Sequence, residues 1–237
     1  RSRFFGIGGA KLDPTVELFL LEGRFPYAIG YGLTETAPVL AGVNPSMVRQ
    51  QSTGPMLEGV EARLDNVKPR SGEGEIDVKG PNVMMGNYKN PEATADSFTE
   101  DGWFRTKDLG VFDRDGYLYI KGRLTNMILG PSGENIYPEE IENVINGHAL
   151  VADSLVKEDM GKLVAIVHFN REALEQKYHT VRENLGQKME NIKQDLMHYV
   201  NSKVIKFSRI SVVVENEDGF EKTPTQKIKR FLYTKKK

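Results

Sequence analysis

The sequence predicts a fold of mixed β and α/β character, with a larger first domain and a smaller α+β second domain. Residues 27–122 consist of short β-rich segments separated by glycine turns, which indicates a small, irregular β-barrel or sandwich. After Arg123 the pattern changes to helices that alternate with strands. We therefore expect one domain over residues 1–123 and another over residues 124–237.

The first part of the chain begins with a helix in residues 12–23, LDPTVELFLLEG. Asp13 can cap its first turn, Pro14 suits the first helical position and Gly23 suits the end. Strands are expected in VEARLDNV, GEIDVKG and YLYIKG, because apolar and polar residues alternate or cluster there as they do in strands. Turn residues in SGEGE and DRDG lie between them.

The second part begins with a helix over residues 137–147, with Pro138 and two acids in its first turn and Gly147 at its end. SLVKED and LVAIVHF predict a hairpin that turns at Met160–Gly161. Residues 171–203 form an amphipathic helix or helix pair whose apolar stripe faces a core. RISVVVE predicts a last strand. The tail from Phe220 onward is basic, and we expect Lys229 and Arg230 in it to be solvated.

Composition excludes several classes of function. The chain of 237 residues has no cysteine, which rules out disulfides, thiolate nucleophiles and cysteine-based zinc sites. Its net charge of −1 does not suggest a nucleic-acid partner, and no apolar run approaches the roughly 20 residues of a membrane helix. The four histidines show no metal-hydrolase spacing. We expect a cytoplasmic protein, and because the chain enters the apolar run FFGIGGA almost at once, we expect it to be part of a longer polypeptide.

The segment GYGLTETAP, residues 30–38, is the first candidate site. Glycines here let the backbone approach a ligand, and Tyr31 offers a flat face. A hydroxyl on Thr34 and a carboxylate on Glu35 suit a phosphate with bound Mg²⁺. A tight loop with solvated side chains is the alternative, and the segment is not a GxGxxG fingerprint.

Five further motifs occur along the chain, in this order: IGGAKL (7–12), GWFRTKDLG (102–110), DGYLYIKGR (115–123), GPSGENIYPEEIE (130–142) and TPTQKIKR (223–230). Together they resemble the adenylate-forming superfamily of acyl-CoA synthetases, nonribosomal peptide adenylation domains and luciferases. The residues in these motifs are most similar to those of long-chain fatty acyl-CoA synthetases. The resemblance implies the C-terminal part of a large ATP-binding domain with a distorted β-barrel, followed by a small mobile lid domain.

The resemblance assigns roles in nucleotide binding to residues of the first domain. It implies that Thr34 bonds phosphate and that Glu35 binds Mg²⁺. Asp108 would accept hydrogen bonds from both ribose hydroxyls, for which its two carboxylate oxygens are suited. Arg123 would reach the ribose or a phosphate. The remaining residues would hold or line the adenine nucleotide: Gly8, Gly9, Ala10, Tyr31 and Ile120.

In the second domain the resemblance implies that Lys227 is catalytic. Its ammonium group would bridge the attacking carboxylate and the α-phosphate, where charge builds up during adenylation. Gly133 would let the pantetheine arm of coenzyme A pass, and Thr125 would be the hinge. Two positions depart from the family pattern. Thr125 replaces a charged residue, and Gln226 replaces a glycine and would be strained if its φ were positive.

The resemblance implies a fatty acid–CoA ligase that uses ATP and Mg²⁺ to form an acyl-adenylate and then transfers the acyl group to coenzyme A. Its partners would be small molecules, with at most peripheral membrane contact through the lysine tail. The Pro-Lys-Gly phosphate loop of the family is absent from this sequence, so we expect this chain alone to be inactive. The alternatives are an acyl-AMP ligase that serves a carrier protein and a non-catalytic nucleotide-binding module.

Overall fold

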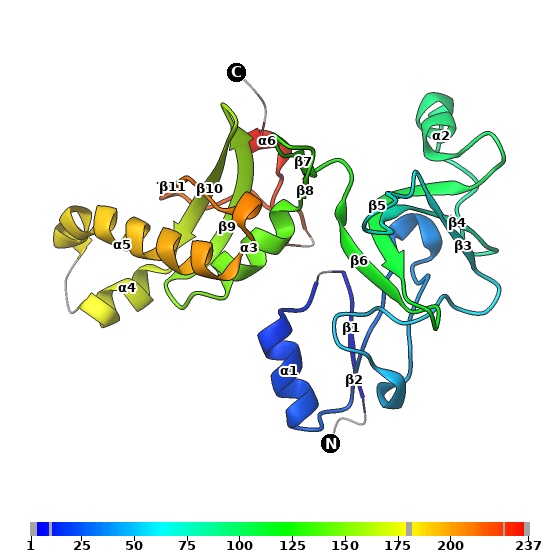
Figure 1. Ribbon diagram of the computed structural model, residues 1–237, viewed down its shortest axis with the longest axis horizontal. Helices are drawn as coiled ribbons and strands as arrows, with labels where there is room; N and C mark the ends of the chain where they lie inside the picture. Colours follow the sequence, from blue (N-terminus) through cyan, green and yellow to red (C-terminus); the bar gives the residue numbers. More distant parts are fainter. Residues whose placement is uncertain (1–3, 10, 179–181, 225, 235–237) are drawn as a thin grey trace. The chain divides into compact units, whose positions relative to one another are not determined.

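The computed structural model describes residues 4–9, 11–178, 182–224 and 226–234 (Figure 1). The chain divides into two compact units, Arg1–Thr125 and Asn126–Lys237. Each unit has its own cluster of buried apolar side chains. Among the described helices, none combines the length and apolar character that crossing a bilayer requires.

The first unit opens with a β-α-β arrangement. Strand β1 (Phe5–Ile7) pairs in parallel with β2 (Tyr27–Ile29), and helix α1 (Pro14–Glu22) connects them. The predicted cap is confirmed, because Asp13 Oδ1 accepts the backbone N–H groups of Thr15 and Val16 at 2.8 and 3.0 Å. Since the two strands are parallel, the glycine turns that follow them leave from the same edge of the pair.

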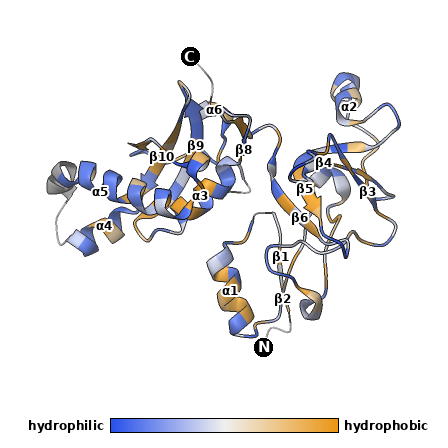
Figure 2. Ribbon diagram, viewed as in Figure 1, coloured by the Kyte–Doolittle hydropathy of each residue, from blue (hydrophilic) through white to orange (hydrophobic). Residues whose placement is uncertain are grey.

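Helix α1 is unusually apolar on its outer side. Figure 2 shows hydrophobic residues along much of this helix, and Val16, Leu18 and Phe19 are exposed. Inward, Glu17 is fully buried and accepts a 2.9 Å hydrogen bond from the hydroxyl of Tyr27. This buried pair holds the helix against β2.

The largest sheet of the first unit is antiparallel and has four strands in the order β3-β4-β5-β6. Its inner face packs on the loop after β2 through a core that contains Leu40, Ile76 and Leu118. The remaining elements of this unit are β3 (Glu61–Asp65), β4 (Gly74–Lys79), α2 (Pro91–Ser97), β5 (Phe104–Phe112), β6 (Leu118–Arg123) and two 3₁₀ turns, Thr34–Thr36 and Pro45–Met47. The three predicted strand segments are confirmed.

The mixed α and β class is confirmed, but the expected barrel is not found in the described residues. The four-stranded sheet is open, with β3 and β6 as its edges. Within the described part of the chain, the outer edge of β6 forms an isolated bridge between Leu118 and Gly54. The irregular segment around Gly54 therefore takes the place where a closing strand would have to pair.

The second unit contains a three-stranded sheet in the order β11-β10-β9, with β9 and β10 antiparallel and β10 and β11 parallel. The predicted hairpin is confirmed, and it turns through Met160 and Gly161, which both have positive φ. The strands of this unit are β7 (Ile128–Leu129), β8 (Asn135–Ile136), β9 (Val151–Asp159), β10 (Lys162–Phe169) and β11 (Val212–Glu215).

Helices cover this sheet and complete the core of the second unit. Ile141 and Ile145 of α3 and Leu196 of α5 are buried against residues such as Val156 and Val167 of the sheet. The predicted segment 171–203 is a helix pair, and residues 179–181 lie outside the described part. The helices are α3 (Pro138–Asn146), α4 (Arg171–Tyr178), α5 (Arg182–Lys203) and α6 (Phe231–Thr234), with a 3₁₀ turn at Lys206–Ser208.

Candidate functional site

Three of the predicted nucleotide-binding residues meet in the first unit. The hydroxyl of Tyr31 donates a 2.8 Å hydrogen bond to Oδ2 of Asp108, and Nε of Arg123 donates a 2.8 Å hydrogen bond to Oδ1 of the same carboxylate. Asp108 and Arg123 are cross-strand partners on β5 and β6. Tyr31 comes from the loop after β2. One buried carboxylate thus connects the two substructures of this unit.

Burial determines the protonation state of Tyr31. Desolvation, followed by the nearby charge of Asp108, raises the pKa of the Tyr31 phenol far above its usual value. Tyr31 therefore remains the donor in its contact with Asp108. The Arg123 side chain is half exposed, so its guanidinium presents positive charge to solvent while it bonds the buried carboxylate.

The side chain of Thr106 fixes the backbone of Asp108. The Thr106 hydroxyl donates to the carbonyl of Ile76 at 2.7 Å and accepts the N–H of Asp108 at 3.1 Å. A register shift between Leu109 and Gly110 follows at once in the pairing of β5 with β6. Such irregularities re-aim side chains at sites. Sequence reasoning missed Thr106, although its place two residues before Asp108 could have indicated it.

The loop that carries Thr34 and Glu35 is closed by a buried threonine. Thr36 Oγ1 accepts the N–H of Leu33 at 3.0 Å and lies 3.0 and 3.1 Å from the carbonyls of Leu33 and Pro38. From outside, the amide of Asn82 donates to the carbonyls of Thr36 and Val39 at 2.8 and 2.9 Å. No sequence signal indicated Asn82, because it lies in a different segment.

This closure leaves Thr34 and Glu35 exposed. Neither side chain has a hydrogen-bond partner among the described residues, whereas the backbone carbonyl of Glu35 accepts the N–H of Met84 at 2.8 Å. The backbone is thus fixed while the hydroxyl and the carboxylate remain available. The loop also requires a glycine, since a Cβ on Gly32 would lie 1.7 Å from the carbonyl oxygen of Pro38.

The first glycine turn lies beside the second. Gly30 donates its N–H to the carbonyl of Ile7 at 2.8 Å, and a Cβ placed on Gly8 would lie 3.6 Å from the carbonyl oxygen of Gly30. Gly9 has a φ of 80° and open space around its Cβ position. Ala10 lies outside the described residues. The glycines predicted to contact adenine are therefore exposed next to the loop of Tyr31.

Two of the predicted roles meet a constraint in this geometry. Tyr31 is only 9% exposed and packs in the same apolar cluster as Ile120, so little of its ring is open to solvent. Each oxygen of Asp108 already accepts one hydrogen bond from a protein group, but a carboxylate oxygen can accept more than one. Stacking by Tyr31 and ribose binding by Asp108 stay predictions.

In the second unit, Lys227 lies in a short loop near the C-terminus. Its side chain is exposed and has no ion-pair partner among the described residues. The expectation that Arg230 is a solvated tail residue is wrong. Its guanidinium pairs with Glu142 through contacts of 2.7 and 2.8 Å, because burial of Glu142 requires a cation.

Three other predicted positions can be described individually. Gln226 has a φ of 63°, the left-handed conformation in which a glycine would be unstrained. Gly133 has a φ of 85° and no atom near its Cβ position, and it lies in the turn between β7 and β8. Thr125 is the last residue of the first unit. Their roles as CoA-contacting residue and hinge stay predictions.

The described residues contain no group of three or more histidine or carboxylate side chains that could hold a metal. An Mg²⁺ ion at Glu35 would therefore depend on phosphate oxygens and water for most of its ligands, as is usual for this ion. The exposed carboxylate of Glu35 is the type of ligand that such an ion needs.

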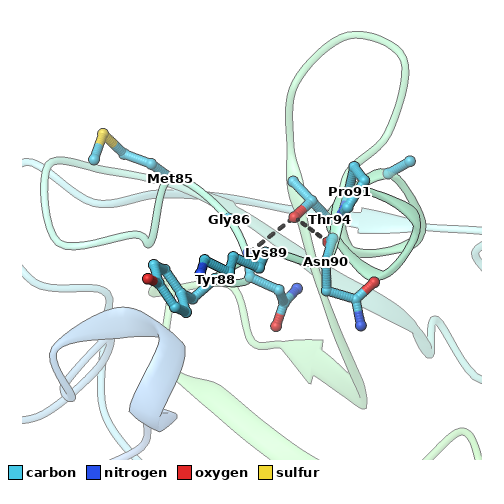
Figure 3. Close-up of a pocket in the computed structure, with 9 residues that line it drawn as sticks. Met85, Gly86, Tyr88, Lys89, Asn90, Pro91 and Thr94 are labelled. Atoms are coloured by element: carbon cyan, nitrogen blue, oxygen red, sulfur yellow. Dashed lines mark hydrogen bonds between the residues drawn. The ribbon is translucent and has the colours of Figure 1, made fainter.

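An open hollow of about 710 Å³ lies elsewhere in the first unit, between α2 and the loop before it (Figure 3). Within it, Thr94 Oγ1 accepts the N–H of Asn87 and bonds the carbonyl of Asn90, both at 2.9 Å. Its lining includes none of the predicted site residues and no carboxylate. It lacks the groups that a metal-bound nucleotide requires.

The two-unit fold and the cluster of Tyr31, Asp108 and Arg123 agree with the resemblance to the adenylate-forming superfamily. Residues 1–88 match the family model described as AMP-binding enzyme. The chain is similar to the structure of o-succinylbenzoate CoA synthetase (MenE) from Bacillus subtilis in complex with the acyl-adenylate OSB-AMP. That likeness has a TM-score of 0.77 and 29% identity, over 99% of this chain and 46% of the other. The resemblance to the adenylate-forming superfamily is therefore confirmed.

The names of the relatives by sequence include different acyl substrates, as two of them illustrate. A 2-succinylbenzoate–CoA ligase of Bacillus licheniformis is 43% identical over 139 residues, which cover 56% of this chain and 29% of the relative. The long-chain-fatty-acid–CoA ligase FadD15 of Mycobacterium bovis is 30% identical over 97% of this chain and 40% of the relative. The chain thus spans between 29% and 40% of the length of these two curated relatives.

Proposed function

We propose that this chain is the C-terminal part of an AMP-forming fatty acid–CoA ligase, with residues 1–123 in the large nucleotide-binding domain and residues 124–237 in the small mobile domain. One observation carries the proposal. A buried carboxylate, Asp108, is held by Tyr31 and Arg123 in a chain similar to CoA ligases along nearly its whole length. The motif resemblance and the two relatives support the same class of reaction.

In this proposal the first unit binds and orients ATP. Asp108 accepts hydrogen bonds from the ribose hydroxyls, and its two protein donors fix its direction. Arg123 adds positive charge beside the ribose or phosphate. The glycine turns at Gly8, Gly9 and Gly32 allow adenine to approach the backbone, and Ala10 and Ile120 complete that surface.

Thr34 and Glu35 act on the phosphates. The hydroxyl of Thr34 donates to a phosphate oxygen, and the carboxylate of Glu35 holds Mg²⁺ together with the nucleotide. The ion, when bound, neutralises charge on the phosphates. ATP with magnesium is bound by B. subtilis MenE, a structure that resembles this chain with a TM-score of 0.77 and 28% identity.

The reaction has two half-reactions. A carboxylate oxygen attacks the α-phosphorus of ATP, pyrophosphate leaves, and an acyl-adenylate forms. The thiol of coenzyme A then attacks the acyl carbonyl, the C–O bond to the phosphate breaks, and AMP leaves with the thiol proton passing to solvent. Lys227 stabilises negative charge in the first step, whereas Gly133 and the hinge at Thr125 serve the second.

The proposed acyl substrate is a long-chain fatty acid, which the wording of the motifs and the relative FadD15 support. A 2-succinylbenzoate substrate is a second candidate, because the B. licheniformis relative is 43% identical over its aligned region. The acyl-AMP ligase alternative differs only in its acceptor, a carrier protein in place of coenzyme A.

The test uses the full-length enzyme that contains this chain, assayed for AMP release with palmitate or 2-succinylbenzoate, with and without coenzyme A. We expect CoA-dependent turnover of palmitate at least tenfold above that of 2-succinylbenzoate, a difference of about 1.4 kcal/mol in transition-state binding. Lys227→Ala should abolish pyrophosphate exchange yet leave thioester formation from supplied acyl-adenylate nearly normal. Loss of both half-reactions, or turnover that ignores coenzyme A, would overturn the proposal.

A further inference from the structure

The loop that carries Lys227 is closed by its own hydrogen bonds. The N–H of Thr223 donates to the carbonyl of Lys227 at 2.8 Å, and the N–H of Lys227 donates to Thr223 Oγ1 at 3.2 Å. Below this pair, Lys222 and Ile228 form an isolated antiparallel bridge. The backbone of Lys227 is thus fixed to the backbone of Thr223 while its ammonium group stays exposed.

Two ion pairs anchor this closed loop to the body of the second unit, one on each side. On the N-terminal side, Nζ of Lys222 lies 2.9 and 2.8 Å from the two carboxylate oxygens of Asp153 on β9. On the C-terminal side, Arg230 pairs with Glu142 on α3. A loop held at both ends by a sheet and a helix has little freedom to move relative to them.

The Arg230 anchor is the more buried of the two. The side chains of Arg230 and Glu142 are 20% and 10% exposed, against 29% for each partner of the Lys222–Asp153 pair. One guanidinium nitrogen contacts both oxygens of Glu142, and the other donates to the carbonyl of Val156 at 3.0 Å. Glu142 Oε1 in turn accepts the N–H of Val156 at 2.6 Å.

This arrangement joins three elements. Strand β9 is an edge strand of the sheet, and Val156 directs its N–H and C=O toward Glu142 and Arg230. An exposed strand edge would leave these two groups to water. Glu142 accepts the N–H of Val156, Arg230 donates to its carbonyl, and the two side chains pair with each other. Helix α3, strand β9 and the C-terminal tail are therefore held together at Arg230, three residues after Lys227.

From this geometry we infer that Glu142 is a positioning residue for Lys227, and that it acts through Arg230. The inference rests on the proposed function, in which the ammonium group of Lys227 must meet charge that forms in the transition state. A catalytic group has to be held to within about 0.5 Å of its working position. A flexible lysine at the end of a frayed tail would not satisfy that requirement, whereas a lysine in an anchored loop does.

The first experiment needs no activity and uses the chain of residues 1–237. Amide hydrogen exchange at Thr223 and Lys227 is followed by NMR in three proteins: the wild type, Arg230→Gln, and a double variant that combines Arg230→Gln with Glu142→Gln. In the double variant the two neutral side chains can still hydrogen-bond to each other. Lys229→Gln is the matched control, because Lys229 pairs with Glu221 near the surface, at 35% and 65% exposure.

We expect exchange at these two amides to rise by about tenfold or more in both Arg230 variants, and to stay unchanged in the control. Amides of β10, such as Ala165, should keep their protection. Unchanged exchange at Lys227 would overturn the inference. Loss of protection throughout the second unit in both variants would also overturn it, since the contact would then support the fold as a whole.

The second experiment separates a positioning role from a structural one. In the full-length enzyme, Arg230→Gln should slow pyrophosphate exchange by up to about 100-fold, the scale of a misplacement near 1 Å, while thioester formation from acyl-adenylate changes less than twofold. Arg230→Lys keeps the positive charge but loses the two guanidinium nitrogens that contact Glu142 and Val156, so it should restore part of the rate of pyrophosphate exchange. Equal losses in both half-reactions would contradict the inference. Faster loop exchange with no effect of Lys227→Ala on either half-reaction would instead refute the proposed function.

Discussion

The hydroxyl of Tyr31 donates a 2.8 Å hydrogen bond to Oδ2 of Asp108, and this contact joins the loop after β2 to strand β5 across 77 residues of sequence. Both residues are buried, at 9% and 6% exposure. A second buried phenol and carboxylate, Tyr27 and Glu17, make a similar contact at 2.9 Å beside helix α1. The same unit therefore contains one such pair inside the candidate site and one outside it.

The two pairs predict different consequences for the same substitution. Tyr31→Phe and Tyr27→Phe should each lower the free energy of unfolding by about 1–2 kcal/mol, because each removes a donor from a buried carboxylate. Only Tyr31→Phe should also weaken ATP binding, by roughly fivefold, since Asp108 loses a group that orients it. Calorimetric unfolding and titration with ATP check both effects. Equal ATP affinities in the two variants would argue against a role for Asp108 in the site.

Asp108→Asn tests the ribose contact directly. We expect ATP affinity to fall by about tenfold, and the preference for ATP over 2′-deoxy-ATP to shrink, because the amide replaces one of the two acceptor oxygens with an NH2 group that can only donate. Titrations of both proteins with both nucleotides form a cycle that isolates this contact. Asp77→Asn is the control, since Asp77 is also buried and bonded to an arginine, Arg63, at 3.2 Å. A preference that survives in Asp108→Asn would mean that other groups read the ribose.

Local chemistry made several features predictable from the sequence. Asp13 caps α1 because its carboxylate follows the rules for short polar residues before a helix, and Met160–Gly161 turns a hairpin because the flanking strands alternate. The helix cap and the hairpin needed only residues that are near one another in the chain. Asp108 and Arg123 were instead identified from the family resemblance, which rests on motifs spread along the whole sequence.

The features that could not be predicted from the sequence depend on contacts between distant segments of the chain. Arg230 was interpreted as a solvated tail residue because its partner Glu142 lies 88 residues earlier, in a helix whose orientation no local pattern indicates. Asn82 clamps the Thr36 loop across 46 residues for the same reason. The expected barrel is not found in the described residues for a similar reason. Strand identity can be recognised locally, but closure depends on which segment reaches the outer edge of β6, and among the described residues an irregular segment, residues 52–54, bonds Leu118 there.

The glycines of the candidate site should differ in their tolerance of alanine. In Gly32→Ala the new methyl group would meet the carbonyl of Pro38, so the loop cannot close, and we expect a loss of about 3 kcal/mol in stability together with loss of ATP binding. Gly9→Ala meets no atom but has a φ of 80°, so about 1 kcal/mol is expected. Gly42→Ala has neither obstacle and serves as the control. Thermal unfolding of the three variants checks this order, and a Gly32→Ala protein as stable as Gly42→Ala would contradict it.

The second unit should lose stability in mild acid because of His148. Its Nδ1 accepts the N–H of Leu150 at 3.3 Å, and its ring lies edge-on to Tyr199. Burial, together with Lys177 and Lys203, lowers the pKa of this imidazole below 6.5. The folded state then binds fewer protons than the unfolded state near that pH. The contribution of His148 to stability is thus complete above pH 6.5 and is lost as the pH falls toward the folded-state pKa.

His148→Asn keeps an acceptor for Leu150 but cannot titrate, so the drop in melting temperature between pH 7.5 and 5.5 should be smaller in this variant. An NMR titration of the His148 ring with a midpoint at or above 6.5 would refute the prediction.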